Sequence, residues 1–402
     1  MRVLILTCNT GGGHNACSKA MQEVFHGNGH DCEIVDAVGF VSEKLSKFLD
    51  WGHTTMYRHV PKLFQFGYGF AEKHPALLED DAAVYKLLTD GTKQLRDFIQ
   101  AGSFDTVICP HVFSGLLLRQ TLKEYPMKLK TAFVATDYTC SPGAARSELD
   151  DYFIPAESLR AEYIEQGIPG HKIIATGIPV RREFYTGTTK ETAKRKLGID
   201  PANTHLLVMC GSMGCGPLEK LTKLLAKQMD GSMALSIVCG TNGKLKEELT
   251  EKFGSASNIH VYGFVQDMNP LMDSADLYLT KPGGLSTTEA AAKRLPMVFI
   301  DAVAGCEEYN LNYFVSIGGA VTAEEPEDLV QLCIRLMKDS LKRKTMAKAL
   351  AASIPPNAAQ QIYEVFSGEN VKNTKTDQIG TTVRRLIETN TEKRDGTWQT
   401  DM

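Results

Sequence analysis

Residues 1–21 read MRVLILTCNTGGGHNACSKAM, which is an apolar run, three glycines and then a segment of helical character. A strand that passes through a glycine-rich turn into a helix is typical of the first unit of a nucleotide-binding α/β domain. The same order returns at residues 204–221, THLLVMCGSMGCGPLEKL. Because the pattern restarts, the sequence predicts two Rossmann-like domains, and a chain of 402 residues is long enough for both.

Apolar runs of strand length alternate with helix-like segments through most of the chain. Runs that are apolar throughout and are separated by helical connections indicate parallel sheets buried on both faces. The first series lies at 2–8, 31–38, 104–110, 130–137, 151–156 and 172–177, and the second at 204–212, 233–240, 258–264, 274–281, 295–301 and 318–323. We predict an α/β protein with an N-terminal domain at 1–180, a linker at 181–203, a C-terminal domain at 204–367 and a polar tail at 368–402.

The overall composition excludes several classes of protein. A net charge of −4 argues against a nucleic-acid binder with a broad basic surface, because such proteins neutralise many phosphates with Lys and Arg. The ten cysteines are scattered singly, many of them in apolar runs, as expected for buried thiols in a reducing cytoplasm. No run of eighteen apolar residues occurs. We therefore expect a cytoplasmic protein whose contact with a membrane, if any, is peripheral.

The first glycine loop admits two interpretations. Gly11, Gly13 and Ala16 fit the dinucleotide fingerprint, and Asp36 lies where a ribose-binding acid would follow, which indicates an NAD(P)-dependent oxidoreductase. The fingerprint is short, and any domain of this kind needs a tight first turn. His14 also occupies a position beside the pyrophosphate that dinucleotide sites tend to keep clear.

The second half of the chain offers a better place for a nucleotide diphosphate. The turn GSMGCG (211–216) can direct backbone N–H groups at an anion. The segment TKPGGLSTTEAAAKRLP (280–296) turns at two glycines into a helix whose first turns hold Glu289, where a carboxylate can accept two ribose hydroxyls. A helix-start carboxylate that merely interacts with the helix dipole is the alternative for Glu289.

Several motifs together resemble one family of enzymes. They are TGGGHNA (10–16), ATDY (135–138), GSMGCG (211–216), residues 261–298 from VYGFVQD to RLPMV, and GCEEYNLNYF (305–314). Over roughly residues 1–365 the chain resembles the glycosyltransferases that transfer a sugar from a UDP-sugar to diacylglycerol, which include monogalactosyldiacylglycerol synthase and processive diacylglycerol glucosyltransferases. These enzymes are similar in turn to the peptidoglycan enzyme that makes lipid II.

The resemblance implies a GT-B fold, in which the two domains face each other across a cleft, and an inverting transfer that needs no metal and no cofactor. It also implies that the C-terminal domain binds most of the donor, UDP-glucose or UDP-galactose. The implied donor contacts are Gly12, Gly13, Gly211, Ser212, Gly214, Phe264, Val265, Lys281, Gly283, Gly284, Ser286, Thr287, Glu289, Glu307 and Asn310. Of these, Ser212 would contact the diphosphate, the backbone near Phe264 and Val265 the uracil, and Glu307 and Asn310 the sugar. One departure is Cys306, which stands where the family often has Gln, so the sugar specificity is open.

The chemistry of glycosyl transfer also singles out His14. The reaction needs a base for the acceptor hydroxyl, and an imidazole with an ordinary pKa of about 6.5 is largely neutral in the cytosol. The chain holds no Asp-x-Asp tripeptide, so helix N-termini and Lys281 are expected to stabilise the departing diphosphate. Asp137 follows an apolar run and either orients His14, contacts the acceptor, or simply forms an Asx turn or helix cap. We predict His14 and Asp137 as the catalytic residues.

Residues 42–70 interleave aromatic and cationic side chains. Such a stretch forms either a packed helix pair with a solvated face or a surface that meets a bilayer at headgroup level. Given the lipid acceptor that the resemblance implies, we predict that Trp51, Phe64 and Phe66 contact the membrane or the acceptor on the inner face of the cell membrane.

The sequence thus predicts a peripheral membrane hexosyltransferase that makes a β-glycosyl diacylglycerol. A related transferase acting on another lipid or a polyprenyl acceptor stays open, because the fold and the donor loops do not determine the acceptor. The oxidoreductase and a sugar-nucleotide-binding protein without catalysis are the alternatives from other classes.

Overall fold

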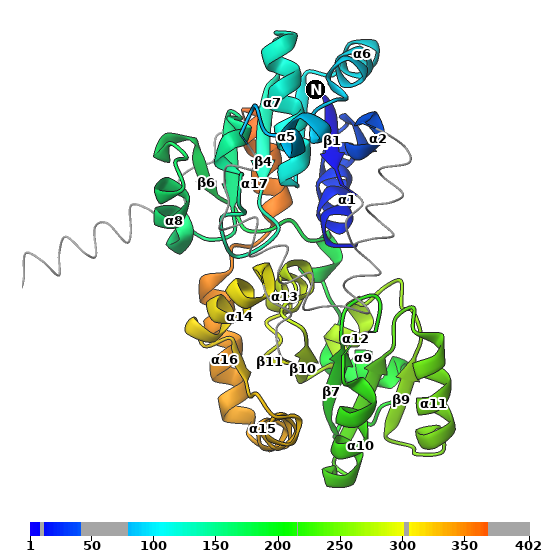
Figure 1. Cartoon of the computed structure of the whole chain (residues 1–402). Coiled ribbons are helices and arrows are strands. Elements are labelled where there is room, and N and C mark those ends of the chain that lie inside the picture. The colour runs from blue at the N-terminus through cyan, green and yellow to red at the C-terminus, as the bar shows by residue number, and fades with distance from the viewer. Residues whose placement is uncertain (9–11, 42–78, 215, 301–304, 369–402) are drawn as a thin grey trace, which may run out of the picture.

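Two parallel sheets organise the chain, one in each of two lobes (Figure 1). The computed structural model describes residues 1–8, 12–41, 79–214, 216–300 and 305–368. The sheet of the N-terminal lobe has the strand order β2-β1-β3-β4-β5-β6, and that of the C-terminal lobe has the order β12-β11-β10-β7-β8-β9. The prediction of an α/β protein with two Rossmann-like domains is confirmed.

Each of the twelve strands lies within one of the predicted apolar runs. In the N-terminal lobe they are β1 (Arg2–Thr7), β2 (Asp31–Asp36), β3 (Thr106–Cys109), β4 (Lys130–Val134), β5 (Asp151–Ile154) and β6 (Ile173–Ala175). In the C-terminal lobe they are β7 (Thr204–Met209), β8 (Met233–Val238), β9 (Ile259–Tyr262), β10 (Leu277–Thr280), β11 (Met297–Phe299) and β12 (Ala320–Thr322). The interior strands β1 and β8 are almost wholly buried, because helices cover both faces of a parallel sheet.

Helices connect successive strands and cover the two sheets. Those of the N-terminal lobe are α1 (Gly12–Gly27), α2 (Val38–Val41), α5 (Ala83–Leu88), α6 (Thr92–Gly102), α7 (Val112–Glu124) and α8 (Arg160–Glu165). The later helices are α9 (Lys190–Lys196), α10 (Leu218–Gln228), α11 (Gly243–Phe253), α12 (Asn269–Ser274), α13 (Gly284–Ala292), α14 (Cys306–Ser316), α15 (Pro326–Lys338), α16 (Ser340–Ser353) and α17 (Ala358–Ser367).

Helix α17 returns to the N-terminal lobe, although it lies within the range predicted for the C-terminal domain (Figure 1). The ring of Tyr363 lies 5.7 Å from that of Phe25 in α1, and Phe366 lies 5.9 Å from Phe153 in β5. Lys130 Nζ donates to the Phe366 carbonyl at 3.0 Å. The chain therefore crosses between the lobes twice, and the predicted domain boundaries stay a prediction. Residues 369–402 of the predicted tail lie outside the described residues.

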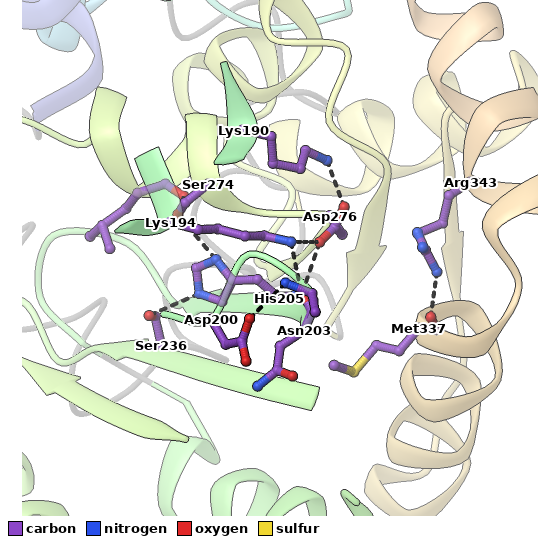
Figure 2. A network of polar contacts seen from close by, with 12 residues as sticks. Lys190, Lys194, Asp200, Asn203, His205, Ser236, Ser274, Asp276, Met337 and Arg343 are labelled. Carbon is purple, nitrogen blue, oxygen red and sulfur yellow. Dashed lines mark hydrogen bonds and ion pairs between the residues drawn. The ribbon is translucent and has the colours of Figure 1, made fainter. Parts of the chain in front are cut away.

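A buried ionic cluster binds the linker helix α9 to the C-terminal lobe (Figure 2). Asp276, just before β10, accepts from Lys190 Nζ at 2.7 Å and from Lys194 Nζ at 2.8 Å. The backbone N–H of His205 donates to the same carboxylate at 2.9 Å. Burial acts to raise the pKa of Asp276, but the charges and hydrogen bonds of the two lysines lower that pKa to about 2. The side chain of Lys194 is only 5% exposed, so its charge depends on this carboxylate.

We predict that Asp276→Asn lowers the free energy of unfolding of the C-terminal lobe by about 3 kcal/mol at pH 7, because it leaves the Lys194 charge buried without its counter-ion. The carboxylate has a depressed pKa in the folded state, so its stabilisation is present above its ordinary pKa and is lost as the pH falls towards about 2. Urea unfolding at pH 7 and between pH 4 and pH 2 measures both effects. Glu219→Gln, in the exposed pair with Lys223, is the control and should leave stability almost unchanged. Equal stability of the two variants would contradict the assignment.

Candidate functional site

The strand orders place one candidate ligand site in each lobe. In the N-terminal sheet the chain runs outward from β1 to β2 and then returns to pair β3 with β1 on the other side. In the C-terminal sheet β8 and β10 flank β7 in the same way. Ligands of open α/β sheets bind beyond the carboxyl ends of strands at such switch points. The predicted site residues that follow β1, β7 and β10 are therefore at the places where the topology favours binding.

His14 lies in the first turn of α1, directly after the first glycine loop, and is half-buried. Its Nδ1 lies 3.0 Å from the carbonyl oxygen of Pro110, which follows β3, and 3.2 Å from Thr136 Oγ1, which follows β4. A carbonyl oxygen only accepts, so Nδ1 carries the proton in this contact and a neutral ring keeps its lone pair on Nε2. The backbone thus sets the tautomer in which Nε2 is the basic nitrogen.

His111, which follows β3, caps the N-terminus of α7. Its Nδ1 accepts from the Phe113 backbone N–H at 3.1 Å. Its ring meets that of His14 edge-on, with the ring centroids 4.6 Å apart. The cap fixes the His111 ring, and the His111 ring in turn packs against the ring of His14.

Asp137 links the end of β4 to the C-terminal lobe. Its Oδ1 accepts from Asn310 Nδ2 of α14 at 2.8 Å. Burial raises the pKa of Asp137 to about 6, against the lowering effect of this hydrogen bond, and the nearby Glu307 carboxylate raises that pKa further. Asp137, Glu307 and Asn310, predicted as site residues from distant parts of the sequence, are therefore neighbours.

The second glycine loop, 211–216, is held against the loop that follows β8. The Gly240 backbone has a φ of +56°, and a Cβ there would lie 2.2 Å from the Ser212 carbonyl oxygen, so only glycine fits. The Thr241 N–H donates to that same oxygen at 2.9 Å. If Gly216 carried a Cβ, that atom would lie 3.6 Å from Lys281 Cε. A buried lysine therefore lies beside the glycine loop, as an anion site requires.

Helix α13 presents its N-terminal end to the other lobe (Figure 1). A Cβ at Gly284 would stand 2.0 Å from the Thr136 carbonyl oxygen, and Leu285 lies beside Gly13 of the first glycine loop. Two turns into the helix, Glu289 is half-buried. Burial raises the pKa of Glu289 to about 7, against the opposing charge of Arg181. A carboxylate with so high a pKa beside a glycine turn is typical of a ligand-binding position.

The other predicted residues lie in loops after the strands or in the first turns of α1 and α13. Gly12, at the start of α1, faces open space. Gly211, after β7, also faces open space and has a φ of +69°. Phe264 follows β9 and is 64% exposed, so its ring is available for stacking. Ser286 and Thr287 donate their hydroxyl protons to the Gly283 carbonyl. Trp51, Phe64 and Phe66 lie outside the described residues.

Sequence reasoning missed three partners at this site: the Pro110 carbonyl, Thr136 and Tyr138. Thr136 and Tyr138 flank the predicted Asp137 in the motif ATDY, so the motif itself was the available signal. The carbonyl of Pro110 left no signal, because a main-chain acceptor has no residue-specific signature.

Two family matches divide the chain between the two lobes. Monogalactosyldiacylglycerol synthase matches residues 14–180, and the glycosyltransferase family 28 C-terminal domain matches residues 205–362. Curated relatives include the processive diacylglycerol beta-glucosyltransferases of Bacillus cytotoxicus, 27% identical, and Bacillus mycoides, 26% identical. Each alignment covers 92% of this chain and 94% of the relative.

Solved structures with a similar fold include glycosyltransferases of the GT-B type. MurG of Acinetobacter baumannii has a TM-score of 0.61 at 15% identity, over 91% of this chain and 99% of that one. The spinosyn rhamnosyltransferase SpnG bound to thymidine diphosphate has a TM-score of 0.56 at 14% identity, over 92% and 100%. The predicted GT-B fold is confirmed, and the resemblance to the diacylglycerol glycosyltransferases is confirmed by the succession of these two domain matches along the chain.

Proposed function

We propose that the protein transfers a hexose from UDP-glucose or UDP-galactose to diacylglycerol, with inversion at the anomeric carbon, and so makes a β-glycosyl diacylglycerol. The observation that carries the proposal is the contact between the start of α1, which holds His14, and the start of α13, where Leu285 lies beside Gly13. The relatives from Bacillus, which are diacylglycerol beta-glucosyltransferases and align over 92% of the chain, support diacylglycerol as the acceptor.

In this proposal His14 Nε2 is the general base. The acceptor oxygen forms a bond to the anomeric carbon from the face opposite the diphosphate, while the hydroxyl proton passes to Nε2. The bond between the anomeric carbon and the diphosphate oxygen breaks, and UDP leaves with the bonding electron pair. The contact of Nδ1 with the Pro110 carbonyl keeps the lone pair on Nε2 and stabilises the imidazolium that forms.

The C-terminal lobe binds the donor. Glu289 accepts from the ribose hydroxyls, and the amides of the loop at Gly211, Ser212 and Gly214, together with Lys281, stabilise the diphosphate. The backbone near the exposed Phe264 and the half-buried Val265 contacts the uracil. Glu307, which lies near Asp137, approaches the hexose. With backbone dipoles and Lys281 facing the leaving group, we propose that the transfer needs no metal ion.

The acceptor enters from a membrane to which the protein attaches peripherally, on its cytoplasmic face. In the part of the chain that the structure describes, no helix is long and apolar enough to cross a bilayer. Trp51, Phe64 and Phe66 stay the predicted contacts with the lipid.

The reaction can be tested with diacylglycerol vesicles and a panel of labelled UDP-sugars. We expect a labelled glycolipid with UDP-glucose or UDP-galactose, in the β configuration by proton NMR, and an undiminished rate in the presence of EDTA. If no donor gives a lipid product, the acceptor is wrong. If EDTA abolishes the transfer, the metal-independent mechanism is wrong.

We predict that His14→Ala lowers kcat by a factor on the order of 100, as expected for a lost general base, and leaves UDP affinity almost unchanged. Initial rates and calorimetric titration with UDP measure the two effects. His26→Ala, at the far end of the same helix, is the matched control and should keep full activity. A His14→Ala variant with an ordinary kcat would reject His14 as the base.

We predict that UDP binds more weakly as the pH falls below about 7, because protonation of Glu289 removes its charge and turns one of its two acceptor oxygens into a donor. The phosphate of UDP titrates in the same pH range, so the parent protein is compared with Glu289→Gln. This variant should bind UDP more weakly than the parent at pH 8, and its affinity should change less with pH. Calorimetric titrations at pH 6 and pH 8 measure both proteins. Parallel pH dependences would contradict ribose binding by Glu289.

A further inference from the structure

Three consecutive residues after β4 project from the N-terminal lobe into the C-terminal lobe. Thr136 fits against Gly284, Asp137 accepts from Asn310, and Tyr138 is only 2% exposed between α13 and α14. Both ends of the segment are held in their own lobe. Ala135 N–H donates to the Phe153 carbonyl at 3.0 Å, and Glu162 of α8 accepts from Thr139 Oγ1 at 2.6 Å. The projecting residues therefore move with the N-terminal lobe.

The ring of Tyr138 is enclosed by side chains of the C-terminal lobe. It stacks on Tyr313 with centroids 4.4 Å apart and meets Phe314 edge-on at 4.7 Å. Its hydroxyl lies 3.0 Å from Thr288 Oγ1. Thr288 donates its own proton to the Gly284 carbonyl at 2.6 Å, so the Tyr138 hydroxyl is the donor in the contact between the lobes.

Asn310 uses its whole amide to join the two lobes. Its Oδ1 accepts from the Tyr138 N–H at 2.7 Å, and its Nδ2 donates to Asp137 at 2.8 Å and to the Pro282 carbonyl at 2.9 Å. The N–H of Tyr138 only donates and the carbonyl of Pro282 only accepts, so the amide orientation is fixed. Asn310 has no exposed surface, and its polar atoms are satisfied within the protein.

The same segment contacts the proposed base. Thr136 Oγ1 lies 3.2 Å from His14 Nδ1, two residues before the enclosed Tyr138. The helix that receives Tyr138 and Thr136, α13, also carries Glu289. One continuous set of contacts therefore runs from the donor-binding helix through residues 136–138 to His14.

We propose that Asn310, Tyr138 and Thr288 form an interdomain clamp that sets the position of His14 relative to the bound donor, so that Tyr138 and Asn310 are positioning residues for the transfer. The inference rests on the proposed function. It gives Asn310 a role other than the sugar contact predicted from the sequence. Loosening the clamp lowers the fraction of time in which the base and the donor are aligned, while donor binding to the C-terminal lobe alone persists.

The test compares Asn310→Ala and Tyr138→Phe with a control that loses an equally buried tyrosine hydroxyl. We expect kcat to fall about tenfold in Asn310→Ala and about threefold in Tyr138→Phe, because each variant loses hydrogen bonds between the lobes. The Kd for UDP should stay within about twofold of that of the parent protein. Tyr152→Phe is the control, because its hydroxyl contacts Ser147 and the Leu149 N–H inside the N-terminal lobe. It should lower thermal stability and leave kcat unchanged.

A double-mutant cycle separates positioning from a general loss of stability. Because the Tyr138 hydroxyl acts through Thr288, the combination of Tyr138→Phe with Thr288→Val should lower kcat no further than either change alone. Additive losses, or a kcat of Asn310→Ala within about twofold of the parent, would overturn the clamp.

If the parent protein transfers no hexose to diacylglycerol, the proposed function is wrong. The clamp between the lobes is then tested by small-angle X-ray scattering. Asn310→Ala should then show a larger radius of gyration than the parent protein, because the lobes separate. An unchanged scattering profile would reject the clamp.

Discussion

Parallel strand pairing is the constraint on which the rest of this structure depends. In each sheet all strands end at one edge, and the crossovers diverge on either side of β1 and of β7. Polar loops and helix N-termini therefore gather at two switch points, where unsatisfied N–H groups can bind an anion. The two lobes bring these edges together. The N-terminal end of α1, which carries His14, and the N-terminal end of α13 then meet without further secondary structure.

The sequence predicted the strands well because they are apolar on both faces, a pattern that short-range composition reveals. The glycine loops were equally visible, since positions such as Gly211 adopt a φ that favours glycine. Contacts between distant segments were not visible. Helix α17 returns to the N-terminal lobe through Tyr363 and Phe366, and nothing in its apolar pattern distinguishes that partner from the sheet nearby in sequence. The family resemblance implied that Asn310 contacts the sugar, whereas its burial between the lobes depends on Tyr138, 172 positions away.

The fold by itself does not determine the reaction. Structures of similar shape include a UDP-GlcNAc 2-epimerase from Neisseria meningitidis, with a TM-score of 0.58 at 14% identity, beside the rhamnosyltransferase SpnG. A shared two-lobed fold can therefore serve different reactions, and the groups at the site distinguish them. In this chain the N-terminal lobe presents the His14 imidazole, whose tautomer is fixed by the Pro110 carbonyl, and this arrangement favours a transferase that removes a proton from its acceptor over an oxidoreductase. Gly13 then serves close approach between the lobes, since it lies beside Leu285 of α13.

The buried carboxylates Asp276, Asp137 and Glu289 differ in the direction in which their pKa values are shifted. Asp276 has its pKa lowered by two lysines, so its ionised form stabilises the fold. Burial raises the pKa of Asp137 and of Glu289, so ionising either of them at neutral pH costs folding free energy. Carboxylates that destabilise the fold persist where a ligand or a partner lobe compensates, and these two lie at the lobe contact and beside the glycine turn of the donor helix. Asp276 holds the linker helix to its lobe, whereas Glu289 is the proposed ribose ligand and Asp137 lies in the contact between the lobes.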